Sequence, residues 1–148
     1  MSTISGRFAR VVIGSNIVAE MGNMNINRST DEVDTTSFGD GWGKSDVGMK
    51  KWSGAVSGSL DAEDANGQQV LEDAWDSGEL VQDIRFYMKY STTVGDKVVY
   101  YAPDTESDAD AGVRILTQEV ATDKSGVASV SFNFSGSGPC KKIVETLT

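Results

Sequence analysis

A strand is predicted from Trp52 to Leu60, because larger side chains alternate there with small polar ones. Trp52, Val56 and Leu60 share one parity, and serine or alanine occupies the other. Successive side chains of a strand point to opposite faces, so one face of this strand is small and rich in hydroxyl groups. From Leu80 to Tyr90, apolar side chains alternate with mostly polar ones, which predicts a second strand with one apolar and one wet face.

The residues between these two strands predict one short amphipathic helix. Asn66 and Gln69 have the spacing of a capping box at its start, and Gly78 is placed to end it. Apolar residues at helical spacing form a single stripe, as a helix that covers a sheet requires. The stripe consists of Val70, Leu71, Ala74 and Trp75.

Further short strands are predicted on both sides of this central unit. Residues 97–102 are apolar on both faces, so this strand is expected either to be buried or to lie at a subunit contact. Its apolar side chains include Val98, Val99, Tyr100 and Tyr101. The other predicted strands cover residues 8–13, 16–27, 30–38, 113–120 and 127–134, the last two as a hairpin.

Residues 38–50 predict a flexible loop that carries aromatic side chains. Three glycines alternate with other residues from Gly39 to Gly43, while Phe38 and Trp42 are large and apolar. A mobile loop with aromatic anchors often becomes ordered against another molecule. The alternative is that Trp42 packs back onto its own domain.

The length and composition favour one mainly β domain. A chain of 148 residues can bury roughly two thirds of its unfolded surface around a single core. Sixteen glycines, two prolines and short alternating runs favour a β-sandwich or barrel-like fold with one flanking helix over a helical bundle. The N-terminus lacks the apolar centre of a signal peptide, so synthesis in the cytoplasm is expected. No apolar run is long enough to anchor the chain in a membrane.

Acidic residues dominate the centre of the chain. The formal net charge is −9, and no Lys or Arg occurs from Ser53 to Ile84. This balance argues against nucleic-acid binding through phosphate neutralisation, which requires a basic surface. The run is either a solvated surface that keeps the protein soluble or a surface that repels DNA. Its acidic residues are Asp61, Glu63, Asp64, Glu72, Asp73, Asp76, Glu79 and Asp83.

No pattern of catalytic residues is present in the sequence. The chain has no His, the usual general base and metal ligand, and Cys140 therefore has no imidazole to activate it. The carboxylates from Asp104 to Asp110 match a calcium-binding loop poorly, because Ala111 stands where such a loop requires Gly. We therefore expect no enzymatic activity, no cofactor and no metal site.

Four segments, in their order and spacing, carry a resemblance that covers nearly the whole chain. They are the strand 52–61, the helix around 70–75, the strand 84–87 and the terminal strand 130–138. Together they resemble a bacteriophage tail tube protein. Members of this family form a mainly β subunit with a flanking helix, and they assemble into hexameric rings that stack into a hollow tube for the genome.

The resemblance implies a structural virion protein of the phage tail, with one tail-tube-like domain over residues 1–148 and an assembly loop at about 38–50. It implies that Phe38 and Trp42 contact a neighbouring subunit or ring, and that the strand 97–102, which is apolar on both faces, makes a further contact. The small polar faces would suit a hydrophilic wall along which DNA passes without specific binding. These wall candidates are Ser53, Ser57, Ser59, Ser129, Ser131 and Asn133. The implied partners are other copies of the chain, a tape measure protein, and tail completion or tip proteins.

Two alternatives share some of these features. A tube subunit of a contractile tail, or of a secretion-system-like injection apparatus, would have the same fold and ring geometry. A ligand-binding β-sandwich, such as a carbohydrate-binding module, would use Trp42 and Trp52 as stacking platforms. Such a module is normally exported, and no signal segment is recognisable here.

Overall fold

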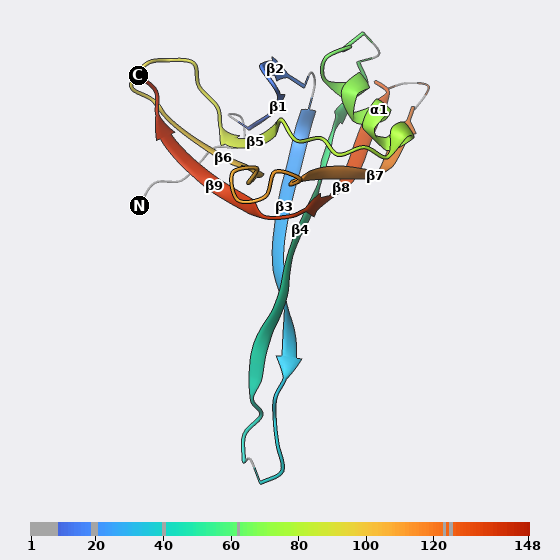
Figure 1. Ribbon diagram of the computed structural model, residues 1–148. Coiled ribbons are helices and arrows are strands. Elements are labelled where there is room, and N and C mark those ends of the chain that lie inside the picture. Colours follow the sequence, from blue (N-terminus) through green and yellow to red (C-terminus); the bar gives the residue numbers. More distant parts are fainter. Residues whose placement is uncertain (1–8, 19–20, 40, 62, 123, 125) are drawn as a thin grey trace.

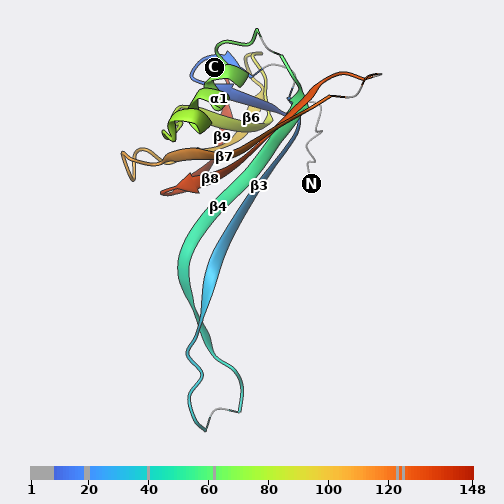
Figure 2. The ribbon, with the colours of Figure 1, turned by 90° about the vertical axis from the view of Figure 1, so that its right-hand side faces the viewer.

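Two antiparallel sheets and one helix form a head, from which a long two-stranded arm projects (Figures 1 and 2). The computed structural model describes residues 9–18, 21–39, 41–61, 63–122, 124 and 126–148. The predicted fold class, mainly β with one short flanking helix, is confirmed. Within the described residues, the helix falls far short of the length needed to cross a membrane.

The first sheet has five strands in the order β2-β1-β5-β6-β9. Its strands are β1 (Arg10–Ile13), β2 (Asn16–Ile17), β5 (Ile84–Lys89), β6 (Lys97–Pro103) and β9 (Cys140–Thr146). β6 is an inner strand, paired with β5 on one side and β9 on the other. This position explains why both of its faces are apolar. The predicted first strand is confirmed from Arg10 onward, and its residue Phe8 lies outside the described residues.

The second sheet has four strands in the order β3-β4-β8-β7. Its strands are β3 (Met21–Asp34), β4 (Ser45–Ser59), β7 (Gly112–Ala121) and β8 (Ser129–Ser137). The predicted pairing of the last two as a hairpin is confirmed. The predicted strand that starts at Trp52 is the second half of β4, which lies between β3 and β8.

Aromatic side chains from both sheets meet in the core. Phe86 of β5 stacks on Phe134 of β8, with ring centroids 4.7 Å apart and planes 14° from parallel. Trp52 packs edge-on against both rings, at 6.5 and 6.2 Å. Its indole nitrogen is satisfied because it donates to the carbonyl of Gly138 at 3.0 Å. Gly136 lies directly beneath the indole, where a Cβ atom would come within 1.9 Å of it.

The helix α1 (Gln68–Ser77) ends as predicted but starts differently. Gly78 adopts the left-handed conformation, with φ of 75°, and closes the helix. The predicted capping box of Asn66 and Gln69 is wrong, since Gly67 is the N-cap and makes no side-chain capping bond. Asp64 takes that role instead, because its carboxylate accepts a hydrogen bond from the backbone nitrogen of Gln68 at 3.1 Å.

The arm is longer, and its loop shorter, than the sequence predicts. The sequence predicts two separate strands over 16–27 and 30–38, whereas the structure has one continuous strand, β3, from Met21 to Asp34. β4 begins at Ser45, so only residues 35–44 connect the two strands and the expected loop at 38–50 is corrected. The reason is that backbone pairing continues out to Asp34 and Ser45, beyond the last side chains that reach the core.

Candidate interaction surfaces

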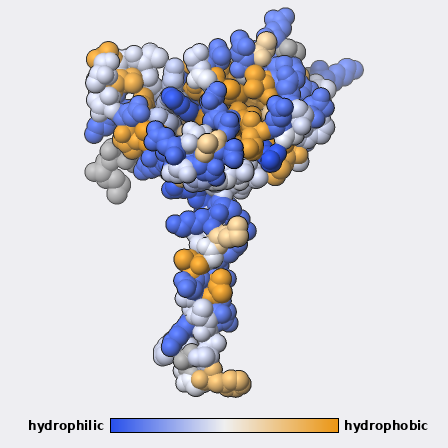
Figure 3. Space-filling view, in the orientation of Figure 1, coloured by the Kyte–Doolittle hydropathy of each residue, from blue (hydrophilic) through white to orange (hydrophobic). Residues whose placement is uncertain are grey.

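Residues 28–51, called the arm below, carry large apolar side chains that no core covers. Figure 3 shows hydrophobic side chains at intervals along the arm and at its end, away from those of the head. The exposed apolar side chains are Val33, Phe38, Trp42, Val47 and Met49. Phe38 and Trp42 are almost fully exposed, at 109% and 87% of their reference areas. Exposed aromatic groups on a projecting element are typical of a protein interaction site.

Hydrogen bonds between Thr36 and Lys44 close the loop that carries Phe38 and Trp42. The Thr36 hydroxyl donates to the Lys44 carbonyl at 3.1 Å and accepts from the Lys44 backbone nitrogen at 2.7 Å. Asp34 accepts a hydrogen bond from the Thr36 backbone nitrogen at 2.9 Å. The hydrogen bonds from Thr36 lower the pKa of Asp34. The loop therefore has a defined base from which its two aromatic side chains extend.

The face of the four-stranded sheet that is turned away from the core is small and polar. Ser57 of β4 lies opposite Ser131 of β8, and Ser59 lies opposite Ser129. The alternate residues of the same strands, such as Val56 and Phe132, are buried in the core. We call the outward side chains the polar face. Its members are Asn23, Asn25 and Asn27 of β3, Ser53, Ala55, Ser57 and Ser59 of β4, Ser129, Ser131, Asn133 and Ser135 of β8, and Thr117, Glu119 and Ala121 of β7.

All six predicted wall residues lie on the polar face, whereas the acidic run does not. Leu71 and Ala74 of α1 belong to the core cluster, so the helix lies on the core side of the sheet. The acidic residues around it are therefore away from the polar face. Among the described residues of the polar face, Glu119 is charged. Arg114 lies at the edge of this face, and its guanidinium donates to the carbonyl of Gly78 at 2.6 Å.

The four predicted contact residues of β6 separate into two pairs. Val98 and Tyr100 are buried within the subunit, with 3% and 4% of their surfaces exposed, so burial rather than a subunit contact explains them. Val99 and Tyr101 are half-buried. The Tyr101 ring lies 5.0 Å from the guanidinium carbon of Arg28, which places it near the base of the arm. Val99 and Tyr101 remain contact predictions.

Trp52 does not provide a stacking platform, because only 5% of its surface is exposed. A carbohydrate-binding module that pairs Trp42 with Trp52 therefore disagrees with the structure. Trp75 is more exposed, at 48%, and its indole nitrogen donates to the carbonyl of Leu116 on β7 at 3.2 Å. The sequence pattern placed Trp75 on the buried stripe of the helix, whereas it covers the edge of the sheet.

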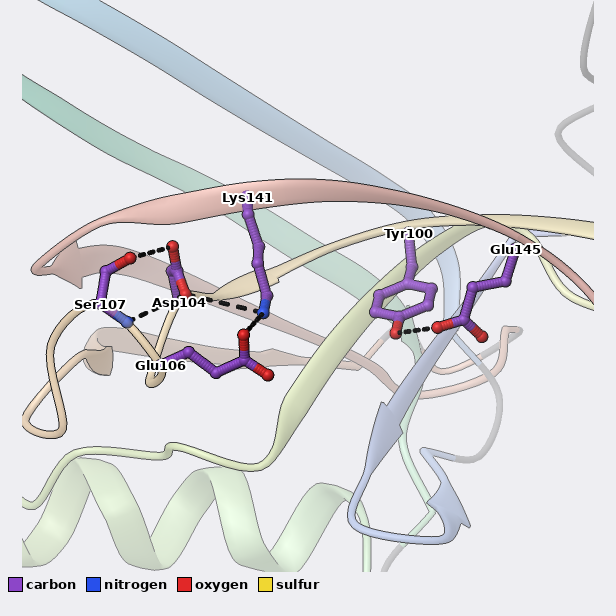
Figure 4. Close-up of polar contacts among 6 residues, drawn as sticks. All are labelled: Tyr100, Asp104, Glu106, Ser107, Lys141 and Glu145. Atoms are coloured by element: carbon purple, nitrogen blue, oxygen red, sulfur yellow. Dashed lines mark hydrogen bonds and ion pairs between the residues drawn. The ribbon is translucent and has the colours of Figure 1, made fainter.

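Polar side chains beyond β6 are joined to each other by hydrogen bonds and ion pairs (Figure 4). The Lys141 ammonium lies 3.6 Å from the Asp104 carboxylate and 3.8 Å from that of Glu106. Asp104 also accepts hydrogen bonds from Ser107. These hydrogen bonds lower the pKa of Asp104, and the Lys141 ammonium lowers it further. No group of three or more potential metal ligands occurs among the residues that the structure describes.

Sequence reasoning missed several residues of these surfaces. The asparagines of β3 alternate as clearly as the serines of β4, but the sequence does not show that the two rows share one face. The strand pairing shows it, because Asn23 lies opposite Ser57 and Asn27 lies opposite Ser53. Val47 and Met49 were expected in a loop, although they lie within β4 and alternate there with Asp46, Gly48 and Lys50. Period-two alternation before Trp52 was the signal available for both.

Comparisons with known proteins agree with this architecture. A family model described as phage tail tube protein matches residues 14–142. A search of curated protein sequences found no significant match. The structure of the virion of a native gene transfer agent particle contains a chain with 15% identity and a TM-score of 0.69, over 95% of this chain and 99% of that one.

Two further solved structures share the fold. The tail of an empty gene transfer agent particle, refined with C6 symmetry, has a chain with 15% identity and a TM-score of 0.67, over 99% of this chain and 100% of that one. The tube-terminating cap of the anti-feeding prophage has 12% identity and a TM-score of 0.62, over 99% of this chain and 93% of that one.

Proposed function

Because this chain belongs to the family of phage tail tube proteins, we propose that it assembles into hexameric rings that stack into a hollow tube through which DNA passes. The subunit has a purely structural role in this proposal and catalyses no reaction. It is made in the host cytoplasm and acts in the virion tail. Sixfold rings are supported by the gene transfer agent tail, which has C6 symmetry and the same fold.

The arm is the observation that carries this proposal. An isolated two-stranded hairpin is only marginally stable in water, and three or more strands or a packed face are normally needed. The arm nevertheless extends far from the head (Figure 2), and its apolar side chains are exposed. Each fully buried side chain of this size contributes about 1.5–3 kcal/mol. A neighbouring subunit or ring that covers the arm accounts for these residues, with Phe38 and Trp42 as anchors.

The polar face supports the assignment of the tube wall. Its side chains are short and mostly uncharged, so they offer DNA phosphates few cations that would neutralise them and hold them in place. Charges further away act weakly, because the Debye length is about 8 Å at physiological ionic strength. We therefore assign the polar face to the lumen. The acidic run around α1 lies away from this face, because the helix packs on the core side of the sheet.

Other proteins complete the proposed tail. A tape measure protein occupies the lumen during assembly, and completion or tip proteins close the two ends of the tube. These partners follow from the family and its hollow architecture, and the polar face is the surface that a tape measure protein would contact.

The similarity to the tube-terminating cap of the anti-feeding prophage supports a second candidate. In that case the chain forms one terminal ring, or a tube subunit of an injection apparatus, instead of the repeating subunit of a DNA-conducting tail. A terminal ring would not stack upon itself. The two candidates therefore differ in the length of the particles that the purified protein forms.

Negative-stain electron microscopy of the purified protein over a range of concentrations tests the proposal. We expect hollow tubes of variable length, together with rings at lower concentration. Single rings that never stack would favour the terminal ring. A protein that stays monomeric at the highest concentration would contradict self-assembly of this chain alone.

A further inference from the structure

A groove with a basic lining lies where the arm leaves the head. Its walls come from β3, β4 and the junction of β8 with β9, and its volume is about 930 Å³. The cations Arg28, Lys50 and Lys51 line it, and the described residues of the lining include no carboxylate. Met49 and Pro139 add apolar surface. The groove therefore suits an acidic segment with some apolar character.

The cations of the groove are only weakly engaged within the subunit. Lys51 lies 3.1 Å from Asp31, but both side chains are more than half exposed, so this pair contributes little. Arg28 lies over the ring of Tyr101, an interaction that leaves its positive charge in place. No ion pair in the described part of the subunit includes Lys50.

The opposite end of the head is acidic. Figures 1 and 2 both place α1 on the side of the head away from the tip of the arm. Asp73, Asp76 and Glu79 are exposed at the last turn of α1 and just beyond it. Negative charge is unfavourable there, because the helix dipole already places partial negative charge at the C-terminus. Asp73 accepts a hydrogen bond from the Gln69 side chain at 3.0 Å within the helix. Asp76 and Glu79 have no such contact, and no described ion pair includes either of them, although the Arg114 guanidinium donates to the nearby Gly78 carbonyl at 2.6 Å.

We propose that the basic groove binds the acidic end of α1 from a second copy of the chain in the adjacent ring. The proposal rests on the tube function above and specifies the contact between stacked rings. Lys50, Lys51 and Arg28 face Asp76 and Glu79 across this contact. The acidic run that the polar face leaves unexplained thereby acquires a role in stacking.

The positions of the two surfaces favour a second copy as the occupant. A patch that is complementary to a different patch on the same molecule makes a head-to-tail contact, which adds subunits without limit unless the geometry closes. Here the two patches lie at opposite ends of the head, along the direction of the arm. Such a contact extends a stack of rings, and opposite charges also steer the rings into the correct polarity.

Charge reversal at each end tests the contact. In one variant, Lys50→Glu and Lys51→Glu make the groove acidic. In the other, Asp76→Lys and Glu79→Lys make the helix end basic, which suits the helix dipole and therefore does not weaken the fold. We expect the critical concentration for tubes, measured by sedimentation and electron microscopy, to rise about tenfold or more in each variant. The rise should shrink in about 1 M salt, where screening is strong.

Mixing the two variants distinguishes this contact from a general effect of net charge. Their ends are complementary, because the acidic groove of one matches the basic helix end of the other, and the reverse. We expect an equal mixture, and the variant with all four changes, to form tubes near the wild-type concentration. The control Lys124→Glu with Thr92→Asp and Thr93→Asp lowers the net charge by the same four units at exposed loop positions, and it should assemble normally.

The outcomes separate this inference from the proposed function. If wild-type tubes form and both variants match them, the groove contact is wrong and the tube function stands. If both variants fail and neither the mixture nor the fourfold variant recovers, the two surfaces do not pair with each other. If the wild-type protein forms neither rings nor tubes, the proposed function itself is contradicted.

Discussion

Glycines beside the core aromatics show how single residues determine the fit of the head. Gly136 leaves the space that the Trp52 indole occupies. Gly54 allows β4 to approach the Asn25 carbonyl of β3, where a Cβ atom would come within 2.1 Å. Neither is a turn residue, so a pattern search that assigns glycine to turns gives no reason for them. Their role depends on contacts between residues that are distant in the sequence.

Gly136→Ala is therefore expected to destabilise the subunit by about 1–3 kcal/mol, because the added methyl group collides with the buried indole of Trp52. Urea denaturation followed by circular dichroism measures the free energy of unfolding. Gly41→Ala is the matched control, since no atom other than those of its chain neighbours lies within 4 Å of its Cβ position. Equal stabilities of the two variants would show that the packing around Trp52 is misplaced.

Tyr100 links stability to pH in the alkaline range. Its hydroxyl donates to the Glu145 carboxylate at 3.2 Å (Figure 4), and burial raises the pKa of Tyr100 above its ordinary value of about 10, although Arg85 opposes this. Because the pKa of Tyr100 is raised in the folded state, the protonated hydroxyl contributes to the free energy of unfolding. This contribution is fully present below about pH 10 and is lost as the pH rises through the folded pKa.

In Tyr100→Phe the hydroxyl is absent, so we expect a loss of about 0.5–1.5 kcal/mol at neutral pH. The variant should then lose less stability than the wild type above pH 10. Urea titrations at several pH values between 7 and 11 measure both effects. Parallel loss of stability in the two proteins would contradict the role assigned to Tyr100.

At the scale of elements, the sequence predicts the head better than the arm. Strands such as β8 alternate because one face meets the core, and the burial of Val130, Phe132 and Phe134 confirms that prediction. The outer part of β3 has no core to face, so its side chains show no alternation and the sequence divides it into two strands. What extends it is backbone pairing with β4, which leaves no trace in hydropathy.

The helix shows a similar division. Gly78 was predictable because a left-handed C-cap favours glycine at one position. The start of the helix could not be predicted from the sequence, because it depends on tertiary contacts of Gln68. This side chain is buried and hydrogen-bonded to the Ser59 carbonyl and the Asp61 backbone nitrogen, both from the preceding segment. Tertiary contacts there replaced the local capping motif that the sequence offers.

Trp42→Ala tests the arm as an assembly element. Because the side chain is 87% exposed, we expect the stability of the monomer to change by no more than about 0.5 kcal/mol. Loss of an anchor at an interface typically costs at least about 2 kcal/mol, so the critical concentration for tubes should rise about thirtyfold. Sedimentation over a concentration series measures it.

Val94→Ala is the control for this change, because Val94 is also exposed but lies in the loop between β5 and β6, away from the arm. It should assemble as the wild type does. Normal tubes from Trp42→Ala would remove the loop from the assembly contact, while leaving the fold of the subunit unaffected.

At the scale of the whole molecule, the pairing of strands collects what the sequence leaves separate. Six wall residues were predictable from alternation in two segments, yet only the register of β3, β4 and β8 shows that they form one continuous face. The same register separates the acidic run from this face. Charge composition alone had left both a repelling wall and a solubilising surface open.

Asn133→Cys, in a Cys140→Ser background, tests whether the polar face lines the lumen. The native thiol of Cys140 is half-buried, and burial raises its pKa, so it reacts slowly with maleimides. The Cys140→Ser change removes this background reaction. We expect a small maleimide to label Asn133→Cys in monomer and tube alike. A maleimide attached to a large polymer should label the monomer but not the tube, because the lumen excludes it.

The control for this labelling is Thr92→Cys, in the loop of the five-stranded sheet, which should react with the large reagent in both states. Equal labelling of Asn133→Cys by the large reagent in monomer and tube would place the polar face on the outside.

A cryo-electron microscopy map of the assembled particle would show directly whether this chain forms a tail tube. We expect a hollow tube with sixfold symmetry, in which the polar face lines the lumen and each arm packs against another subunit. A particle without a lumen, a polar face that points outward, or arms that extend freely into solvent would contradict it.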